Sequence, residues 1–174
     1  MGNRAHAQSI YELPDASQAW ETFTPTALPP LVFQDETGKQ LTVDDYKGHV
    51  LLVNLWATWC GPCKLELPTL AALAPKIRSF GGLILPISID QGGADAVKSY
   101  FSDHNIRTLP ILTDSSGGDL NLLQSPGIPL TVIVRPDGKG VAQLAGGADW
   151  DNQNVLSYLR DLASAKSAAS GNVS

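Results

Sequence analysis

The sequence predicts an α/β fold, with a mixed sheet of about five strands and helices on both of its faces. The first indication is an apolar, strand-forming run at 50–56, followed by helically spaced apolar residues as far as Ile77. The second is the same order repeated, an apolar strand at 83–89 and then a helical pattern at 94–105. The third is Asp137-Gly138 between two apolar runs, a strong signal for a β-hairpin.

Length and composition fit one globular domain. The chain has 174 residues and 43% hydrophobic content, enough for a core that needs no metal or structural disulfide. Its net charge of −5, without a dense basic run, argues against nucleic acid and anionic lipid as partners. No apolar stretch approaches the length that spans a bilayer. We therefore expect a soluble domain that acts as a monomer.

The first 28 residues are expected to form a partly ordered lead-in, because they are largely polar and interrupted by prolines. A short helix is expected from Ala16 to Thr22, with Trp20 and Phe23 docking on the body of the domain. Farther upstream, Ala5-His6-Ala7 has the small-x-small form of a signal-peptidase site. It predicts that an export signal or membrane anchor is missing from this sequence.

An amino-terminal β-hairpin is expected next. Short strand-forming runs flank Asp35-Glu36-Thr37-Gly38, which places the turn at the glycine. Thr42 to Gly48 then has the pattern of a capped helical turn closed by glycine.

The two cysteines of the chain, Cys60 and Cys63, stand between the strand at 50–56 and a helix expected from Gly61 to Phe80. Free amides and the positive end of a helix dipole favour a thiolate at that place, and the thiolate is the nucleophilic form of cysteine. We expect Cys60 to attack and Cys63, one helical turn inward, to resolve the mixed disulfide.

Three other uses of a Cys-x-x-Cys pair fit less well. Structural zinc takes four ligands, and the chain adds only the scattered His6, His49 and His104. A c-type haem needs histidine where Lys64 stands. A structural disulfide that closes so short a loop adds little stability.

The second half of the chain continues the alternation. Pro86 within the strand at 83–89 cannot donate to a ladder, which predicts a bulge or a sheet edge there. A helix from Ala94 to Asn105 and the segment at 109–112 form a central insertion. A short helical turn at 119–124, a hairpin with strands at 130–134 and 140–144, and an amphipathic helix at 152–163 follow.

The stretch Trp59-Cys60-Gly61-Pro62-Cys63-Lys64 resembles the thioredoxin active site, and Pro68 matches the proline that kinks the active-site helix of that superfamily. The preceding Val53-Asn54-Leu55-Trp56-Ala57-Thr58 and the following Leu65-Glu66-Leu67-Pro68 resemble the TlpA/ResA-like branch of exported thiol–disulfide oxidoreductases. The amino-terminal hairpin and the central insertion are similar to the same branch. This resemblance implies a thioredoxin-like domain at 29–165, after the lead-in at 1–28. The Ala/Ser-rich composition of residues 166–174 predicts a disordered tail.

The resemblance also implies a site. Cys60 and Cys63 would act as a redox-active disulfide, without a further cofactor or a metal. The peptide bond before Pro129 would be cis and face the disulfide, and threonine, frequent after this proline in the superfamily, is replaced by Leu130. Five residues are expected to dock the substrate: Trp59, Gly61, Pro62, Ile128 and Pro129.

Two acidic residues are candidates for tuning the cysteine pKa values. Glu66 matches an acidic position of the TlpA-like pattern, or is simply a solvated helix carboxylate. Cytosolic thioredoxin has a buried carboxylate where this chain has Asn54, so that proton acceptor for the second cysteine is missing. Asp90 or Gln91, at the end of the next strand, is a candidate for the same place or for a loop cap.

The expected activity is reduction of specific protein disulfides in the bacterial periplasm. Gly61-Pro62 resembles the dipeptide of reducing thioredoxins. By resemblance, the substrates are apocytochrome c in cytochrome c biogenesis or the cysteines of a copper-site protein, and a membrane thiol-electron transporter supplies the electrons. The alternatives are a general cytosolic-type thioredoxin and a metallochaperone that holds Cu(I) between the two cysteines.

Overall fold

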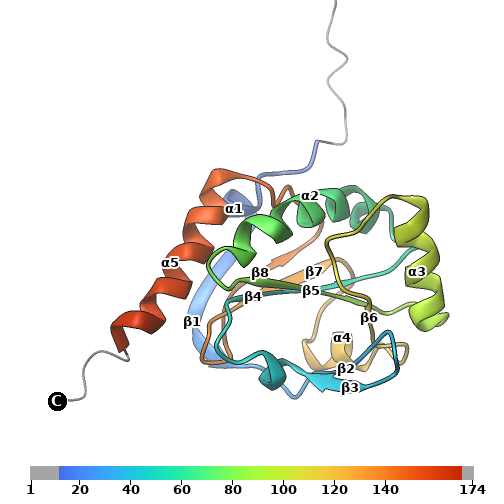
Figure 1. Ribbon diagram of the computed structural model, residues 1–174, viewed down its shortest axis with the longest axis horizontal. Helices are drawn as coiled ribbons and strands as arrows, with labels where there is room; N and C mark the ends of the chain where they lie inside the picture. The colour runs from blue at the N-terminus through green and yellow to red at the C-terminus, as the bar shows by residue number, and fades with distance from the viewer. Residues whose placement is uncertain (1–11, 170–174) are drawn as a thin grey trace, which may run out of the picture.

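The computed structural model describes residues 12–169, whose eight strands form one mixed sheet with helices on both faces (Figure 1). The strand order is β1-β8-β7-β4-β5-β6-β2-β3. Along the chain the elements are α1 (Ala16–Ala19), β1 (Glu21–Ala27), β2 (Val32–Asp35), β3 (Gln40–Thr42), the 3₁₀ helix η1 (Val43–Tyr46), β4 (Leu51–Trp56), α2 (Gly61–Arg78), β5 (Leu83–Ser88), α3 (Gly93–Asp103), β6 (Leu112–Thr113), α4 (Gly118–Leu122), β7 (Leu130–Val134), β8 (Lys139–Ala145) and α5 (Gln153–Ala169). The predicted α/β class is confirmed, with more strands than the five expected.

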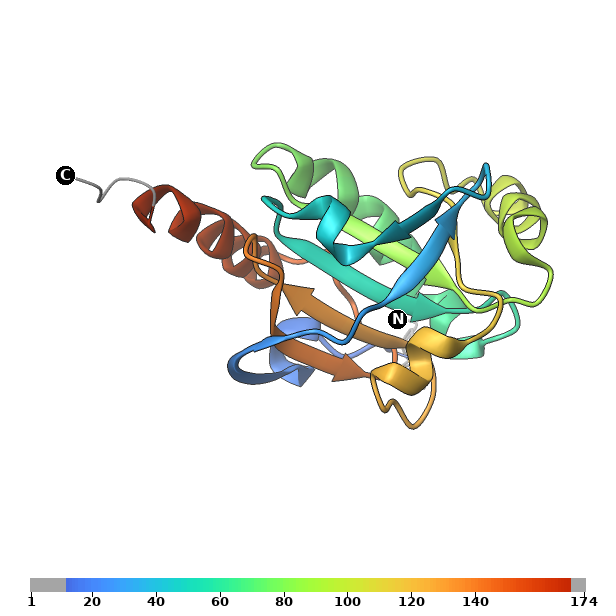
Figure 2. The same cartoon turned by 90° about the horizontal axis from the view of Figure 1, so that it is seen from below.

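Strand β4 lies at the centre of the molecule, parallel to β5 and antiparallel to β7. All six of its residues are buried, and successive side chains point to opposite faces. Leu52 and Trp56 belong to the core beneath α2, α3 and α5, whereas Leu51, Val53 and Leu55 belong to the core beneath η1 and α4. Figure 2 shows η1 and α4 on the face opposite α2 and α5. The cysteine-bearing junction after β4 is therefore anchored from both sides of the sheet.

The expected amino-terminal hairpin is present as β2 and β3, with Gly38 in its turn at a φ of 86°. Strand β2 also pairs with β6, so the hairpin continues the main sheet. The capped turn expected after it is η1, in which Thr42 and Asp45 form a reciprocal capping box.

The lead-in contains a strand that the sequence did not predict. The expected helix from Ala16 to Thr22 ends at Ala19, and β1 then pairs antiparallel with β8 at the edge of the sheet. Pro25 fits there because the register of β1 shifts between Thr22 and Thr26, and edge strands tolerate proline.

The two lead-in aromatics dock on the body of the domain to different extents. Trp20 packs with its ring centroid 6.2 Å from that of Trp150 and 4.8 Å from that of Tyr158. Phe23 is 36% exposed on the edge strand, and the tip of its ring lies against Gly140 of β8. Trp20 therefore fixes the position of the lead-in.

The lead-in is also tied to the loop before α5. The backbone amide of Ala16 donates to the Asp149 carbonyl oxygen, and the Asp149 amide donates to the Pro14 carbonyl oxygen. Asn152 Nδ2 donates to Asp15 Oδ1 at 3.0 Å. These bonds join the start of the described chain to residues 149–152.

Pro86 lies in an interior strand of the sheet without the bulge that was expected, and the expected edge is present only on the β6 side, which is unpaired at this residue. The amides of Leu83 and Ile89 donate to carbonyl oxygens in and beside β4. By alternation, the nitrogen of Pro86 faces β6 instead. Because β6 pairs with β5 only from Ile87 onward, the proline removes no ladder hydrogen bond.

The carboxy-terminal half follows the predicted order, with one correction. Helix α5 continues to Ala169, so residues 166–169 are helical where the sequence predicted a disordered tail. Residues 1–11, including Ala5-His6-Ala7, and residues 170–174 lie outside the described part. None of the helices between residues 12 and 169 has the length and apolarity to cross a membrane.

Candidate active site

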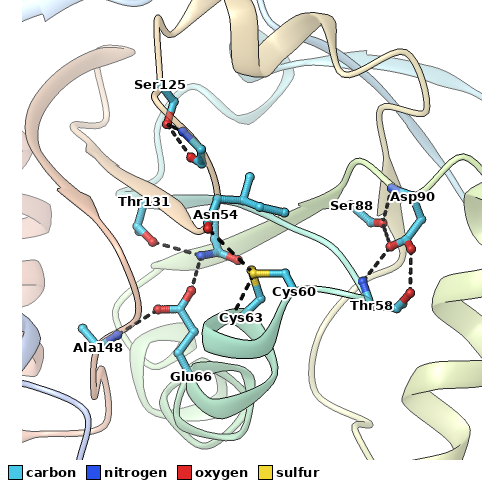
Figure 3. The surroundings of a disulfide bond; sticks show 12 residues. Asn54, Thr58, Cys60, Cys63, Glu66, Ser88, Asp90, Ser125, Thr131 and Ala148 are labelled. Atoms are coloured by element: carbon cyan, nitrogen blue, oxygen red, sulfur yellow. Dashed lines mark hydrogen bonds between the residues drawn. A yellow bond between two sulfur atoms is a disulfide. The ribbon is translucent and has the colours of Figure 1, made fainter. Parts of the chain in front are cut away.

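Cys60 and Cys63 form a disulfide at the junction of β4 and α2 (Figure 3). Cys60 caps the helix, and its Sγ accepts a hydrogen bond from the Cys63 backbone amide at 3.3 Å. Cys60 is 6% exposed and Cys63 is 0% exposed. Cys60 is thus the member of the pair nearer to solvent.

The start of α2 favours negative charge on Cys60 once the disulfide is reduced. The first turn carries no acidic residue and has Pro62 near its start, where a missing amide costs no helical hydrogen bond. The remaining free amides and the helix dipole stabilise a thiolate at the cap.

The predicted docking residues surround Cys60. The Ile128–Pro129 peptide bond is cis, as the resemblance implies. The Ile128 carbonyl oxygen lies 3.7 Å from Cys60 Sγ. Trp59 is 66% exposed, and Gly61 and Pro62 are also on the surface. Trp59, Gly61 and Pro62 are therefore open to solvent beside Cys60, Ile128 is half-buried against its sulfur, and Pro129 is buried.

Glu66 lies beneath the disulfide with an exposure of 0%, so it is not a solvated helix carboxylate. Its Oε1 accepts a hydrogen bond from Asn54 Nδ2 at 2.8 Å. Its Oε2 accepts from the Ala148 amide at 3.1 Å and from Trp150 Nε1 at 3.0 Å. Burial raises the pKa of Glu66 to about 7, although these three hydrogen bonds act to lower it. Glu66 therefore changes charge near neutral pH.

Three members of this network were missed by sequence reasoning. Ala148 and Trp150 reach Glu66 across 82 and 84 residues of chain, and no local pattern marks them. Thr131 pairs with Asn54 across β4 and β7 and accepts from Asn54 Nδ2 at 2.9 Å. The available signal was a hydroxyl within an otherwise apolar strand.

Asp90 is held on the other side of the disulfide from Glu66 (Figure 3). Its carboxylate accepts from the Thr58 amide at 2.9 Å, from Thr58 Oγ1 at 2.6 Å and from Ser88 Oγ at 2.6 Å. The structure does not bring Asp90 and Glu66 together. Asp90 fastens the loop before Cys60 to the end of β5.

A buried and an accessible cysteine joined at a helix start can exchange a disulfide with another protein through a mixed disulfide. Among residues 12–169, no group of three or more His, Cys, Asp or Glu side chains is arranged to hold a metal ion. The fold and the site together define a thiol–disulfide oxidoreductase.

The chain belongs to the AhpC/TSA family, which its residues 24–141 match. It is 30% identical to the thiol-disulfide oxidoreductase ResA of Bacillus anthracis over 134 residues, 77% of this chain and 75% of that protein. The expected relation to ResA-like proteins of the thioredoxin superfamily is confirmed.

Solved structures show the same fold. A secreted thiol-disulfide isomerase from Corynebacterium glutamicum matches with a TM-score of 0.69 and 19% identity, over 88% of this chain and 96% of that chain. The exposed lipoprotein thioredoxin of Streptococcus pneumoniae matches with a TM-score of 0.63 and 23% identity, over 76% and 99%. The predicted thioredoxin-like fold is confirmed.

Proposed function

We propose that this protein reduces specific protein disulfides outside the cytoplasm. The observation that carries the proposal is the asymmetry of the pair: Cys60 is 6% exposed beside the Ile128 carbonyl oxygen, whereas Cys63 is fully buried. Cys60 is the thiolate that meets a partner, and Cys63 is protected from it. Glu66 and Asp90 tune the pair, Glu66 from beneath it and Asp90 through the loop before Cys60.

The reaction proceeds in two exchanges. The Cys60 thiolate attacks one sulfur of the substrate disulfide, forming a mixed disulfide and releasing the other substrate sulfur as a thiol. Cys63, after losing its proton, attacks Cys60 Sγ, forms the Cys60–Cys63 disulfide and releases the second substrate sulfur. Two electrons pass from the cysteine pair to the substrate, which leaves as a dithiol.

The substrate binds as an extended segment beside Cys60. The backbone of Ile128, next to the cis Pro129, offers its polar groups to that segment, and the exposed Trp59, beside Cys60 in the chain, packs against it. A groove lined by Ile89, Gln91 and Ser116 continues from Trp59. These contacts are made largely by backbone and one aromatic ring, so specificity rests on the fit around the substrate cysteines.

The substrates we propose are apocytochrome c cysteines or the cysteines of a copper-site protein, and the reductant is a membrane thiol-electron transporter. Support comes from the ResA relatives and from the Gly61-Pro62 dipeptide, which resembles that of reducing thioredoxins. Relatives described as secreted or as an exposed lipoprotein support an extracytoplasmic location, by export or by a membrane anchor.

The reduction potential of the Cys60–Cys63 pair tests this proposal. The pure protein is equilibrated with graded redox buffers, and the oxidised fraction is measured after the free thiols are blocked. A potential near or below about −250 mV is expected for a reductant that is recharged by an electron supply. A potential near about −120 mV identifies an oxidant and overturns the proposal.

A further inference from the structure

Only the nitrogen end of the Asn54 side-chain amide makes hydrogen bonds to the described residues. Its Nδ2 donates to Glu66 Oε1 at 2.8 Å and to Thr131 Oγ1 at 2.9 Å. Its Oδ1 is buried and has no hydrogen-bond partner among the described residues. Because a buried polar atom without a partner is costly, this acceptor needs an explanation.

The orientation of the amide is dictated by Glu66. The Asn54, Ala148 and Trp150 groups that reach the Glu66 carboxylate are all N–H donors. While Glu66 is ionised, Asn54 must therefore present Nδ2 to it, and Oδ1 is left on the far side of the amide. Figure 3 shows Oδ1 turned toward the disulfide.

The position of Asn54 supports the same contact. Asn54 lies on β4 between Leu52 and Trp56, whose side chains share its face and belong to the core that contains Cys63. Cys63 and Glu66 are three residues apart on α2, and therefore share the helix face that meets β4. One amide thus lies between the buried thiol and the buried acid.

We propose that Asn54 is a positioning residue that links Cys63 to Glu66 in the dithiol form. Its Oδ1 accepts the hydrogen of the Cys63 thiol while Glu66 is ionised. When Glu66 is protonated, the amide turns over, so that Oδ1 accepts from the Glu66 hydroxyl and Nδ2 donates to a Cys63 thiolate. The inference rests on the proposed role of Cys63 as the resolving cysteine.

Each orientation gives both the buried acid and the buried thiol a hydrogen-bond partner. The Thr131 hydroxyl accepts from Nδ2 in the first orientation and donates to Oδ1 in the second. The pair of Glu66 and Cys63 holds one proton in each state, so Cys63 is deprotonated for its attack on Cys60 without a second buried negative charge. Cys60 is the other titratable group beside Asn54, whereas β7 and the loop before α5 contribute Thr131, Ala148 and Trp150, which do not titrate in this range.

The coupling can be measured on Cys63 alone. In a Cys60→Ser background Cys63 is the remaining thiol of the chain, and its pKa follows from thiolate absorbance against pH. A double-mutant cycle compares Asn54 and Asn54→Ala, each with Glu66 and with Glu66→Gln. Glu66→Gln imitates the protonated acid, because its amide nitrogen can donate to Asn54 Oδ1.

With Asn54 present, Glu66→Gln is expected to lower the pKa of Cys63 by about one pH unit. In Asn54→Ala, the same substitution is expected to lower it by no more than half as much, because the charge effect remains and the amide is gone. Equal lowering in both backgrounds overturns the inference. Thr131→Ser is the matched control on the same face: it keeps the hydroxyl that accepts from Asn54 Nδ2, so the coupling should be retained, and a loss of coupling in this variant would also count against Asn54.

A second readout needs no change at Asn54. In the Cys60→Ser protein, the infrared S–H stretch of Cys63 is expected below its position in the urea-unfolded chain, because a hydrogen-bonded thiol has a weaker S–H bond. An unshifted band overturns the inference. Neither readout depends on the direction of catalysis. An oxidising potential with intact coupling refutes the proposed function alone, and a reducing potential without coupling refutes the role of Asn54 alone.

Discussion

The buried Glu66 makes the stability of the oxidised protein depend on pH in a way that Glu66→Gln removes. The pKa of Glu66 rises from 4.5 to about 7 because burial disfavours the charged form. Between these pH values the folded protein keeps a proton that the unfolded chain releases. Stability therefore falls as the pH rises from about 4.5 through 7. At about 1.4 kcal/mol per pKa unit, the loss is about 3 kcal/mol.

The measurement is urea unfolding of the oxidised wild-type and Glu66→Gln proteins at a series of pH values from 4.5 to 8. The informative quantity is the difference in unfolding free energy between the two proteins at each pH. Asp119 also titrates in this range: burial raises its pKa to about 6, against the lowering effect of the hydrogen bond from the Val32 amide and with a smaller raising effect from Asp114. It is present in both proteins and cancels in the difference.

The difference is expected to move by about 3 kcal/mol in favour of the glutamine variant as the pH rises across this window. Two parallel stability curves would show that Glu66 titrates alike in the folded and unfolded chains. A difference that moves in favour of wild type would show that the three hydrogen bonds outweigh burial. Either result would refute the reasoning.

Two further predictions concern α2. A Cys63→Ser variant is expected to trap substrate proteins as mixed disulfides on Cys60, visible as reducible adducts on non-reducing gels, whereas Cys60→Ser is not; equal trapping would contradict the assigned roles. Leu73→Ala is expected to cost about 2–5 kcal/mol in urea unfolding because Leu73 is fully buried, whereas Leu65→Ala, at a site 48% exposed, should change stability by less than about 0.5 kcal/mol. Similar decreases in unfolding free energy for Leu73→Ala and Leu65→Ala would show that burial of the leucine does not determine the destabilisation.

The parts of the fold that the sequence predicted are those with a strong local pattern. The strand before Cys60 is continuously apolar, and the helix after it repeats leucines on one face, so both the junction and its cysteine pair could be placed. Strand β1 has no such pattern. It is exposed along its length and contains Pro25, and it exists because β8 offers it an edge. The bulge predicted at Pro86 was wrong because the direction of the proline nitrogen depends on the register with β4, which the sequence does not show.

The site, like the fold, was predictable where a local sequence pattern marks it and unpredictable where distant segments assemble it. Cys60, Cys63, Trp59, Gly61 and Pro62 form one compact motif, and Ile128 and Pro129 followed from the resemblance. The surroundings of Glu66 are instead assembled from β4, β7 and the loop before α5. Whether Glu66 was exposed or buried depended on which face of α2 met the sheet and on Trp150. A carboxylate on a helix carries no sign of such distant donors.

The ties between the lead-in and residues 149–152 affect how this domain can be shortened. Ala148 and Trp150, the donors on either side of Asp149, hold one oxygen of Glu66, and Asp149 is in turn held by the backbone of Pro14 and Ala16. A fragment that began at residue 29 would keep both sulfurs and the whole Cys-x-x-Cys motif. It would nevertheless lose the backbone hydrogen bonds of Pro14 and Ala16 to Asp149, which hold the Glu66 donors in place. The smallest unit with native redox behaviour therefore begins upstream of α1, more than a dozen residues before the first strand that the sequence reveals.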